Sequence, residues 1–116
     1  MMNNIIRACV ENLSDIASKM KLRNAKDPYS DGYDAAIYCI KDGIEDRIGF
    51  ISYVYDEEND SSTASGCEEQ INSLIRILHE CADETSEKVF DVGFRDAVRE
   101  FTQLITPIIE WLSTYI

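Results

Sequence analysis

Residues 29–37 read YSDGYDAAI and residues 90–98 read FDVGFRDAV, so a glycine, an alanine and the apolar side chains around them recur 61 positions further along the chain. The same offset, kept without a gap, pairs apolar residues on both sides of these stretches. The pairs include Leu13 with Leu74, Ile16 with Ile77, Ile44 with Ile105 and Ile48 with Ile109. Because most pairs fall on one helical face, the match predicts a duplicated helical hairpin. The alternative is that any two amphipathic hairpins of equal length align in this way.

Apolar residues at steps of three and four predict four helices. Their expected ranges are about 5–20, 29–55, 71–82 and 89 to the C-terminus. Antiparallel helices joined by short loops bury their apolar stripes against one another. The expected fold is therefore all-α, a four-helix bundle built from two tandem helical hairpins with a pseudo-twofold axis.

One helical domain is expected over all 116 residues, with repeat units at 6–55 and 67–116 and an acidic linker at 56–66. Two features conflict with this scheme. The aromatic and β-branched run at 50–55 would also suit a strand, and Pro107 should kink or break the last helix. The repeat favours helix at 50–55. The long helices, about 40 Å each, should extend beyond the short ones, which predicts a homodimer.

The chain is strongly acidic, with 22 acidic and 11 basic residues and a net charge of −11. This charge repels nucleic acid and anionic membranes, so the expected partner is a basic protein or nucleoprotein, without direct binding to nucleic acid or membrane. The four cysteines form no C-x-x-C pair, and no apolar run resembles a signal peptide or a membrane span. Reduced thiols and a cytoplasmic location are expected.

Few residues in the sequence could carry chemistry. It holds one histidine, His79, and it has no phosphate-binding loop, nucleophile elbow or dinucleotide-binding motif. Cys9, Cys67 and Cys81 lie on or beside apolar stripes, where thiolates are disfavoured, so we expect them to pack in the core. We therefore expect no catalytic residue, no cofactor and no metal site.

One enzymatic alternative rests on paired carboxylates. Asp42 with Glu45, and Glu80 with Asp83, stand one turn apart on two expected helices and could hold Mg²⁺. The arrangement loosely resembles the all-α nucleotide pyrophosphohydrolases, whose metal-binding acids face into a bundle. At 100° per residue, however, Asp42 and Glu45 point away from the core face that contains Ile37.

The same helical wheel gathers acids beside and opposite the core face of the second helix. They are Asp31, Asp34, Asp42, Glu45 and Asp46. The ordinary interpretation is a solvated face that keeps the protein soluble. The functional interpretation is a ligand for a basic groove and a partial mimic of nucleic-acid phosphates, because acids one turn apart stand about 6 Å from each other.

Large aromatic residues also lie away from the core face. Phe50 and Tyr53 fall on the outer side of the wheel, and the offset of 61 places Trp111 at the position of Phe50. Exposed aromatics at matching positions predict an interface, because tyrosine and tryptophan dominate binding hot spots. Burial at the end of the bundle is the alternative. Together with the five acids, these three residues are the predicted partner-binding set.

The helix start G-[YF]-x-x-A-[IV] occurs at residues 32–37. A short, acidic, all-helical chain with such a start resembles, in size, charge and style, small proteins of phages and mobile elements, including anti-CRISPR and anti-restriction inhibitors. The resemblance implies a stoichiometric inhibitor of a basic, nucleic-acid-handling host complex. A toxin-neutralising immunity protein or helical adaptor, and a Mg²⁺-dependent pyrophosphohydrolase, stay open as alternatives.

Overall fold

The computed structural model describes residues 3–54 and 59–116, and within these residues it contains four helices and no strand. The helices are α1 (Asn4–Lys19), α2 (Pro28–Val54), α3 (Asp60–Cys81) and α4 (Val89–Ser113). They form an elongated molecule of 48 × 25 × 20 Å. The predicted all-α four-helix bundle is confirmed.

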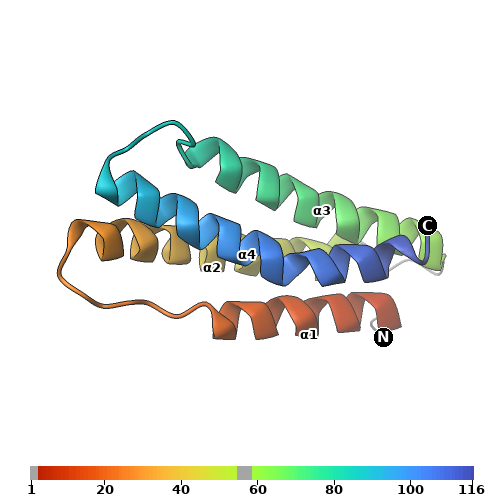
Figure 1. Ribbon diagram of the computed structural model, residues 1–116. Helices are drawn as coiled ribbons and strands as arrows, with labels where there is room; N and C mark the ends of the chain where they lie inside the picture. The colour runs from red at the N-terminus through yellow and green to blue at the C-terminus, as the bar shows by residue number, and fades with distance from the viewer. Residues whose placement is uncertain (1–2, 55–58) are drawn as a thin grey trace.

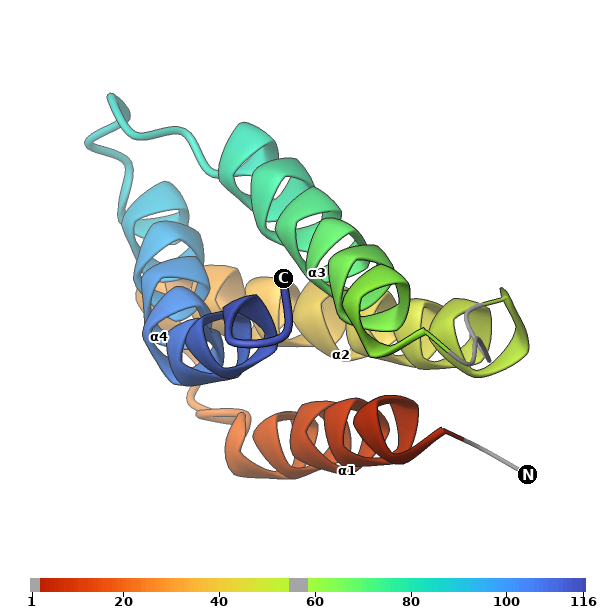
Figure 2. The same cartoon turned by 90° about the vertical axis from the view of Figure 1, so that its right-hand side faces the viewer.

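The two long helices run in the same direction. Figure 1 shows α2 and α4 starting at one end of the molecule and finishing at the other, whereas α1 and α3 run back in the opposite direction. Figure 2 shows that α2 and α4 cross, with α1 and α3 on opposite sides of the view. Each hairpin therefore contributes one long helix to a central crossing and one shorter helix that covers it.

The crossing of α2 and α4 is a contact between backbones. A Cβ atom on Gly32 would lie 1.8 Å from the carbonyl oxygen of Phe90, and a Cβ atom on Gly93 would lie 2.0 Å from the carbonyl oxygen of Tyr29. Both glycines are buried. No side chain fits at either position, so only glycine allows the two helices to approach this closely.

The two halves of this contact are made by residues that match at the offset of 61 found in the sequence. Gly32 and Gly93 are 61 positions apart, as are Tyr29 and Phe90, and each glycine meets the carbonyl of the other helix's matching residue. The two hairpins thus contribute equivalent residues to the crossing. Duplication as the origin of the chain stays a prediction.

The predicted linker at 56–66 is wrong for residues 60–66, which form the first turns of α3. The side chain of Asn59 caps this helix by accepting the N–H of Ser62 at 3.1 Å. Thr63 and Ala64 are then fully buried. Small residues enter the helix here because it packs closely against its neighbours. Residues 56–58 lie outside the described residues.

Both sequence conflicts are settled in favour of helix. α2 continues to residue 54, so the predicted helix at 50–54 is confirmed, and Tyr55 lies outside the described residues. α4 does not end at Pro107, as the sequence suggested it could. Ile105 and Ile108 on either side of the proline are buried, and their packing holds the helix through the missing hydrogen bond.

Glycine substitutions test the crossing. We expect Gly32→Ala to lower the free energy of unfolding by about 1–3 kcal/mol, because its Cβ would overlap a backbone carbonyl that cannot rotate away. Gly49→Ala is the matched control, since Gly49 is an exposed residue within α2 with nothing within 4 Å of its Cβ position. It should raise the free energy of unfolding by about 0.5–1 kcal/mol. Urea denaturation followed by circular dichroism measures both, and equal effects would refute the close crossing.

Candidate functional site

The predicted acidic stripe lies on α2, and the structure places four of its five members on the surface. Asp31, Asp42, Glu45 and Asp46 are exposed. Within residues 3–54 and 59–116, no ion pair joins any of them to a basic side chain. These four carboxylates therefore carry charge that the rest of the described chain does not neutralise by direct contact.

Asp34, the fifth predicted acid, has an internal role. Its carboxylate accepts the backbone N–H of Arg23 at 2.7 Å and that of Asn24 at 3.0 Å. Asn24 has a φ of 55°, a left-handed conformation that asparagine tolerates better than most residues. Asp34 thus holds the connection between α1 and α2 in place, and we do not count it among the acids available to a partner.

In the described parts of the chain, the basic residues of α2 form no ion pair with the exposed acids. Arg47 reaches across to α3, where its guanidinium donates to the carbonyl oxygen of Gln70 at 3.2 Å and to the hydroxyl of Ser73 at 3.4 Å. Lys41 lies beside a hollow between α1 and α2. The outward side of α2 therefore keeps a negative field.

Two acids in the first half of α4, in contrast, accept hydrogen bonds from tyrosines of α2. The hydroxyl of Tyr29 donates to Asp96 at 2.7 Å, and that of Tyr33 donates to Glu100. Burial, followed by the hydrogen bond to Glu100, raises the pKa of Tyr33 to about 12. The guanidinium of Arg23 lies over both rings, 5.0 Å from the Tyr29 centroid and 5.8 Å from the Tyr33 centroid. These acids join α2 to α4 and are not part of the exposed stripe.

The three predicted aromatics do not form one surface. Tyr53 is 90% exposed and Phe50 is exposed. Trp111 is half-buried, packs against the hydrophobic core and meets the ring of Tyr115 edge-on at 5.5 Å. The expectation that Trp111 would be an exposed counterpart of Phe50 is therefore wrong. The premise for a homodimer also weakens, because α3 spans 22 residues and nearly matches the long helices.

Sequence reasoning missed Tyr38, which is 59% exposed on α2. Tyr38 precedes Asp42 by one turn, so the helical wheel already placed it among the acids. On an α-helix, residues separated by four or seven positions lie on nearly the same side. Five acids and tyrosines of α2 are spaced in this way. They are Asp31, Tyr38, Asp42, Asp46 and Tyr53, and together we call them the α2 face.

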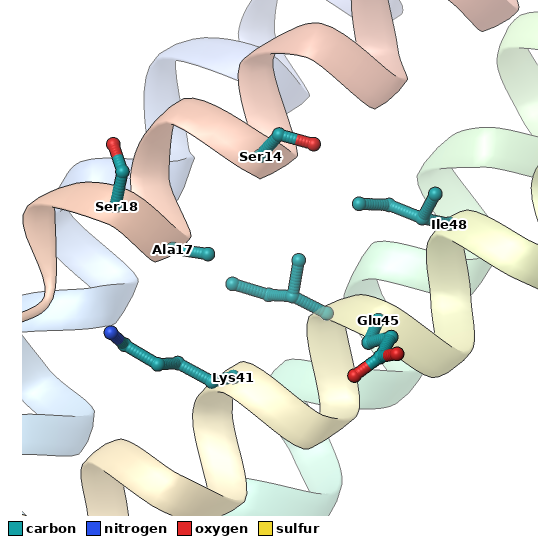
Figure 3. Close-up of a pocket in the computed structure, with 7 residues that line it drawn as sticks. Ser14, Ala17, Ser18, Lys41, Glu45 and Ile48 are labelled. Atoms are coloured by element: carbon teal, nitrogen blue, oxygen red, sulfur yellow. The ribbon is translucent and has the colours of Figure 1, made fainter.

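A hollow of about 400 Å³ lies on one side of this face, between α1 and α2. Figure 3 shows Ser14, Ala17 and Ser18 from α1 opposite Lys41, Glu45 and Ile48 from α2. Ile44 also lines the hollow and is buried. The hollow is broad and open, with an apolar bottom and one basic and one acidic side chain at its α2 edge. Glu45 therefore borders this hollow, apart from the α2 face.

The four carboxylates of the enzymatic alternative lie on the surface of the bundle. Asp42 and Glu45 are exposed on α2. Asp83 follows the end of α3 and accepts the N–H and hydroxyl of Thr85, at 3.0 and 2.8 Å, within a turn. Among the residues that the structure describes, no three His, Cys, Asp or Glu side chains are close enough to hold a metal ion.

The remaining polar groups have local contacts. His79 has a ring nitrogen 3.1 Å from the hydroxyl of Thr102 on α4. Cys9 and Cys67 are fully buried, and the hydrogen bond between them, together with burial, raises the pKa of the Cys9 thiol. Cys81 is exposed, so its predicted place in the core is wrong. In the described part of the chain, no helix is both long and apolar enough to cross a membrane.

Comparison with known proteins gives no relative. No protein-family model, no curated protein and no solved structure matches the chain. What the α2 face does must therefore be argued from its own residues.

Substitution can distinguish an acid that stabilises the fold from an acid that is available to a partner. We expect Asp34→Ala to lower the free energy of unfolding by about 1 kcal/mol, because two backbone N–H groups lose their acceptor. Asp42→Ala should change it by less than about 0.5 kcal/mol, as for most exposed positions. Denaturation by urea compares the two variants, and equal losses would show that Asp42 also has a structural role.

The tyrosine contact should respond to high pH. The pKa of Tyr33 in the folded protein, about 12, lies above the usual value near 10. Its contribution to stability is therefore fully present below pH 10 and is lost as the pH rises through 12. Ultraviolet absorbance should show the highest tyrosine ionisation step disappear in Tyr33→Phe. If the ionisation step at the highest pH persists in this variant, that step belongs to another tyrosine.

Proposed function

We propose that the chain is a non-enzymatic protein-binding module that inhibits a basic, nucleic-acid-handling host complex by stoichiometric binding. One observation carries the proposal. Asp42 and Asp46 are exposed one turn apart on α2, and within the described residues no basic side chain forms an ion pair with them. A protein site that binds nucleic-acid phosphates is positively charged, which complements these two carboxylates.

Electrostatics supports this choice of partner. The chain carries a net charge of −11, so a basic surface attracts it over a distance and raises the association rate. A rigid helix presents its carboxylates at a regular spacing, as a phosphate backbone presents its charges. Occupation of a basic groove by the α2 face would therefore exclude nucleic acid from it.

The tyrosines support a protein partner. Tyr38 and Tyr53 flank the two acids on the α2 face and are largely exposed. Tyrosine offers a large apolar surface with a polar end at little cost in conformational entropy, which suits a protein interface. A toxin-neutralising immunity protein would use the same chemistry against a basic toxin, so the two proposals differ in partner and not in surface.

The test is inhibition of defined nucleic-acid-cleaving enzymes. Purified CRISPR effector nucleases and restriction endonucleases are assayed for DNA cleavage with increasing amounts of the chain. We expect one of them to be inhibited at an equimolar ratio. The double variant Asp42→Lys/Asp46→Lys should then weaken inhibition about tenfold or more, equivalent to about 1.4 kcal/mol of binding free energy. Raising the salt concentration should weaken the inhibition by the wild type, because salt screens exposed charges.

The matched control is Glu11→Lys/Glu110→Lys, which reverses two exposed acids on α1 and α4. Each double variant changes the net charge by +4, from −11 to −7. If inhibition follows net charge alone, both variants weaken it equally and the α2 face is not the site. If no enzyme of these classes is inhibited, the inhibitor proposal is wrong.

A further inference from the structure

A second hollow, of about 350 Å³, borders the α2 face on its other side, between α2 and α3. Leu74 and Leu78 are buried within it, while Ile77 is exposed at its margin. Asp42 and Asp46 of the α2 face line its α2 edge. The hollow, which we call the α2–α3 groove, thus combines an apolar bottom with an acidic edge.

The other half of the bundle contains the matching hollow, between α1 and α4. Residues that line the two hollows correspond at the spacing of 61 that relates the two hairpins. The pairs are Asp42 with Gln103, Gly43 with Leu104, Asp46 with Pro107, Arg47 with Ile108, and Ile77 with Ile16. The bundle therefore offers an internal comparison for the α2–α3 groove.

The matching isoleucines of the two hollows differ in exposure. Leu104 packs against the core beside Ile16, which is only 5% exposed. At the matching place α2 has Gly43, against which the end of Leu74 packs, and Ile77 is 43% exposed. The isoleucine of the α2–α3 groove is thus the more exposed of the two.

Arg47 offsets only part of the negative charge of the groove. Its guanidinium is held by the carbonyl oxygen of Gln70 and the hydroxyl of Ser73, so its charged end is directed to α3. Both acceptors are neutral, so Arg47 keeps its positive charge, and with Asp42 and Asp46 the lining of the groove carries a net charge of −1. The edge formed by Asp42 and Asp46 stays negative.

We propose that the α2–α3 groove receives a leucine-like side chain from a basic amphipathic helix of the partner protein. The apolar side chain covers Ile77, while lysine or arginine residues one turn away pair with Asp42 and Asp46. A second copy of this chain does not suit the groove, because it would bring a net charge of −11 to an acidic edge. The inference rests on the proposed function for its basic partner and adds the form of the contact.

Two native cysteines report on the groove. Cys39 and Cys81 are exposed and line it from α2 and α3, respectively. Cys9 and Cys67 are fully buried and lie outside it. Alkylation by iodoacetamide, followed by mass spectrometry, should therefore modify the first pair readily and the second slowly. An occupant of the groove should protect the first pair alone.

The probe is a synthetic helical peptide of about 18 residues, about 27 Å of helix, with leucines on one face and lysines beside them. One control peptide replaces the leucines by serine, and another replaces the lysines by glutamine. We expect the basic leucine peptide to bind most tightly, measured by fluorescence anisotropy, and to slow alkylation of Cys39 and Cys81 about tenfold. Alkylation of Cys9 and Cys67 should stay slow, which shows that the fold persists.

Two variants of the chain test the apolar contact. Ile77→Ser should weaken peptide binding about tenfold, whereas Val89→Ser, at an exposed aliphatic residue that does not line the groove, should leave it unchanged. Gly43→Leu places an apolar side chain of the chain's own in the groove and should also block the peptide. Its Cβ would meet the movable end of Leu74 at 2.4 Å, so circular dichroism must confirm that this variant folds.

The outcomes separate the groove from the acidic face. Binding that depends on Asp42 and Asp46 but leaves Cys39 and Cys81 unprotected overturns the groove and keeps the proposed function. Equal binding by the glutamine peptide overturns the basic partner instead. Equal binding by the serine peptide shows charge attraction alone and refutes the leucine contact. Protection of both cysteines without peptide, in a chain that light scattering shows to be dimeric, makes a second copy the occupant.

Discussion

The backbone contacts of Gly32 with Phe90 and of Gly93 with Tyr29 determine how the rest of the bundle is arranged. They bring α2 and α4 together in parallel, carbonyl against Cα, at a distance that excludes any side chain at the two glycines. The inner sides of the long helices are then occupied by each other, and α1 and α3 must pack along their flanks. What stays uncovered on α2 is its outward side, where Tyr38, Asp42 and Asp46 lie.

The sequence predicted the helices wherever large apolar residues recur at helical steps. The long helix to residue 54 follows from Ile44 and Ile51, both buried as the pattern requires. The start of α3 could not be found this way, because its first turns are small and polar, as linkers are. Thr63 and Ala64 are buried by the close packing of neighbouring helices. The distance between helices depends on tertiary packing, which the periodicity of one segment cannot predict.

The candidate site was predictable where position on one helix decides exposure. The wheel placed Asp42 and Asp46 outward, and the same wheel would have found Tyr38 had aromatics among the acids been considered. It failed for Asp34, whose carboxylate holds the connection that folds back from α1. It failed also for Trp111, which packs against the core and the ring of Tyr115. Both failures involve contacts with segments that a single-helix projection leaves out.

The difference between the two hairpins is more informative about function than their likeness. On the α4 side, the one acid and the one base that line the hollow, Asp15 and Lys19, balance each other. On the α2 side, Asp42 and Asp46 outnumber Arg47, so the matching hollow is acidic. Gly43 itself leaves no gap, because the end of Leu74 packs where a Cβ would stand. The exposed part of Ile77 leaves apolar area in water that a partner could cover. An exposed isoleucine beside an acidic edge is what a binding surface for a basic partner requires, which is why we place recognition on the α2 side.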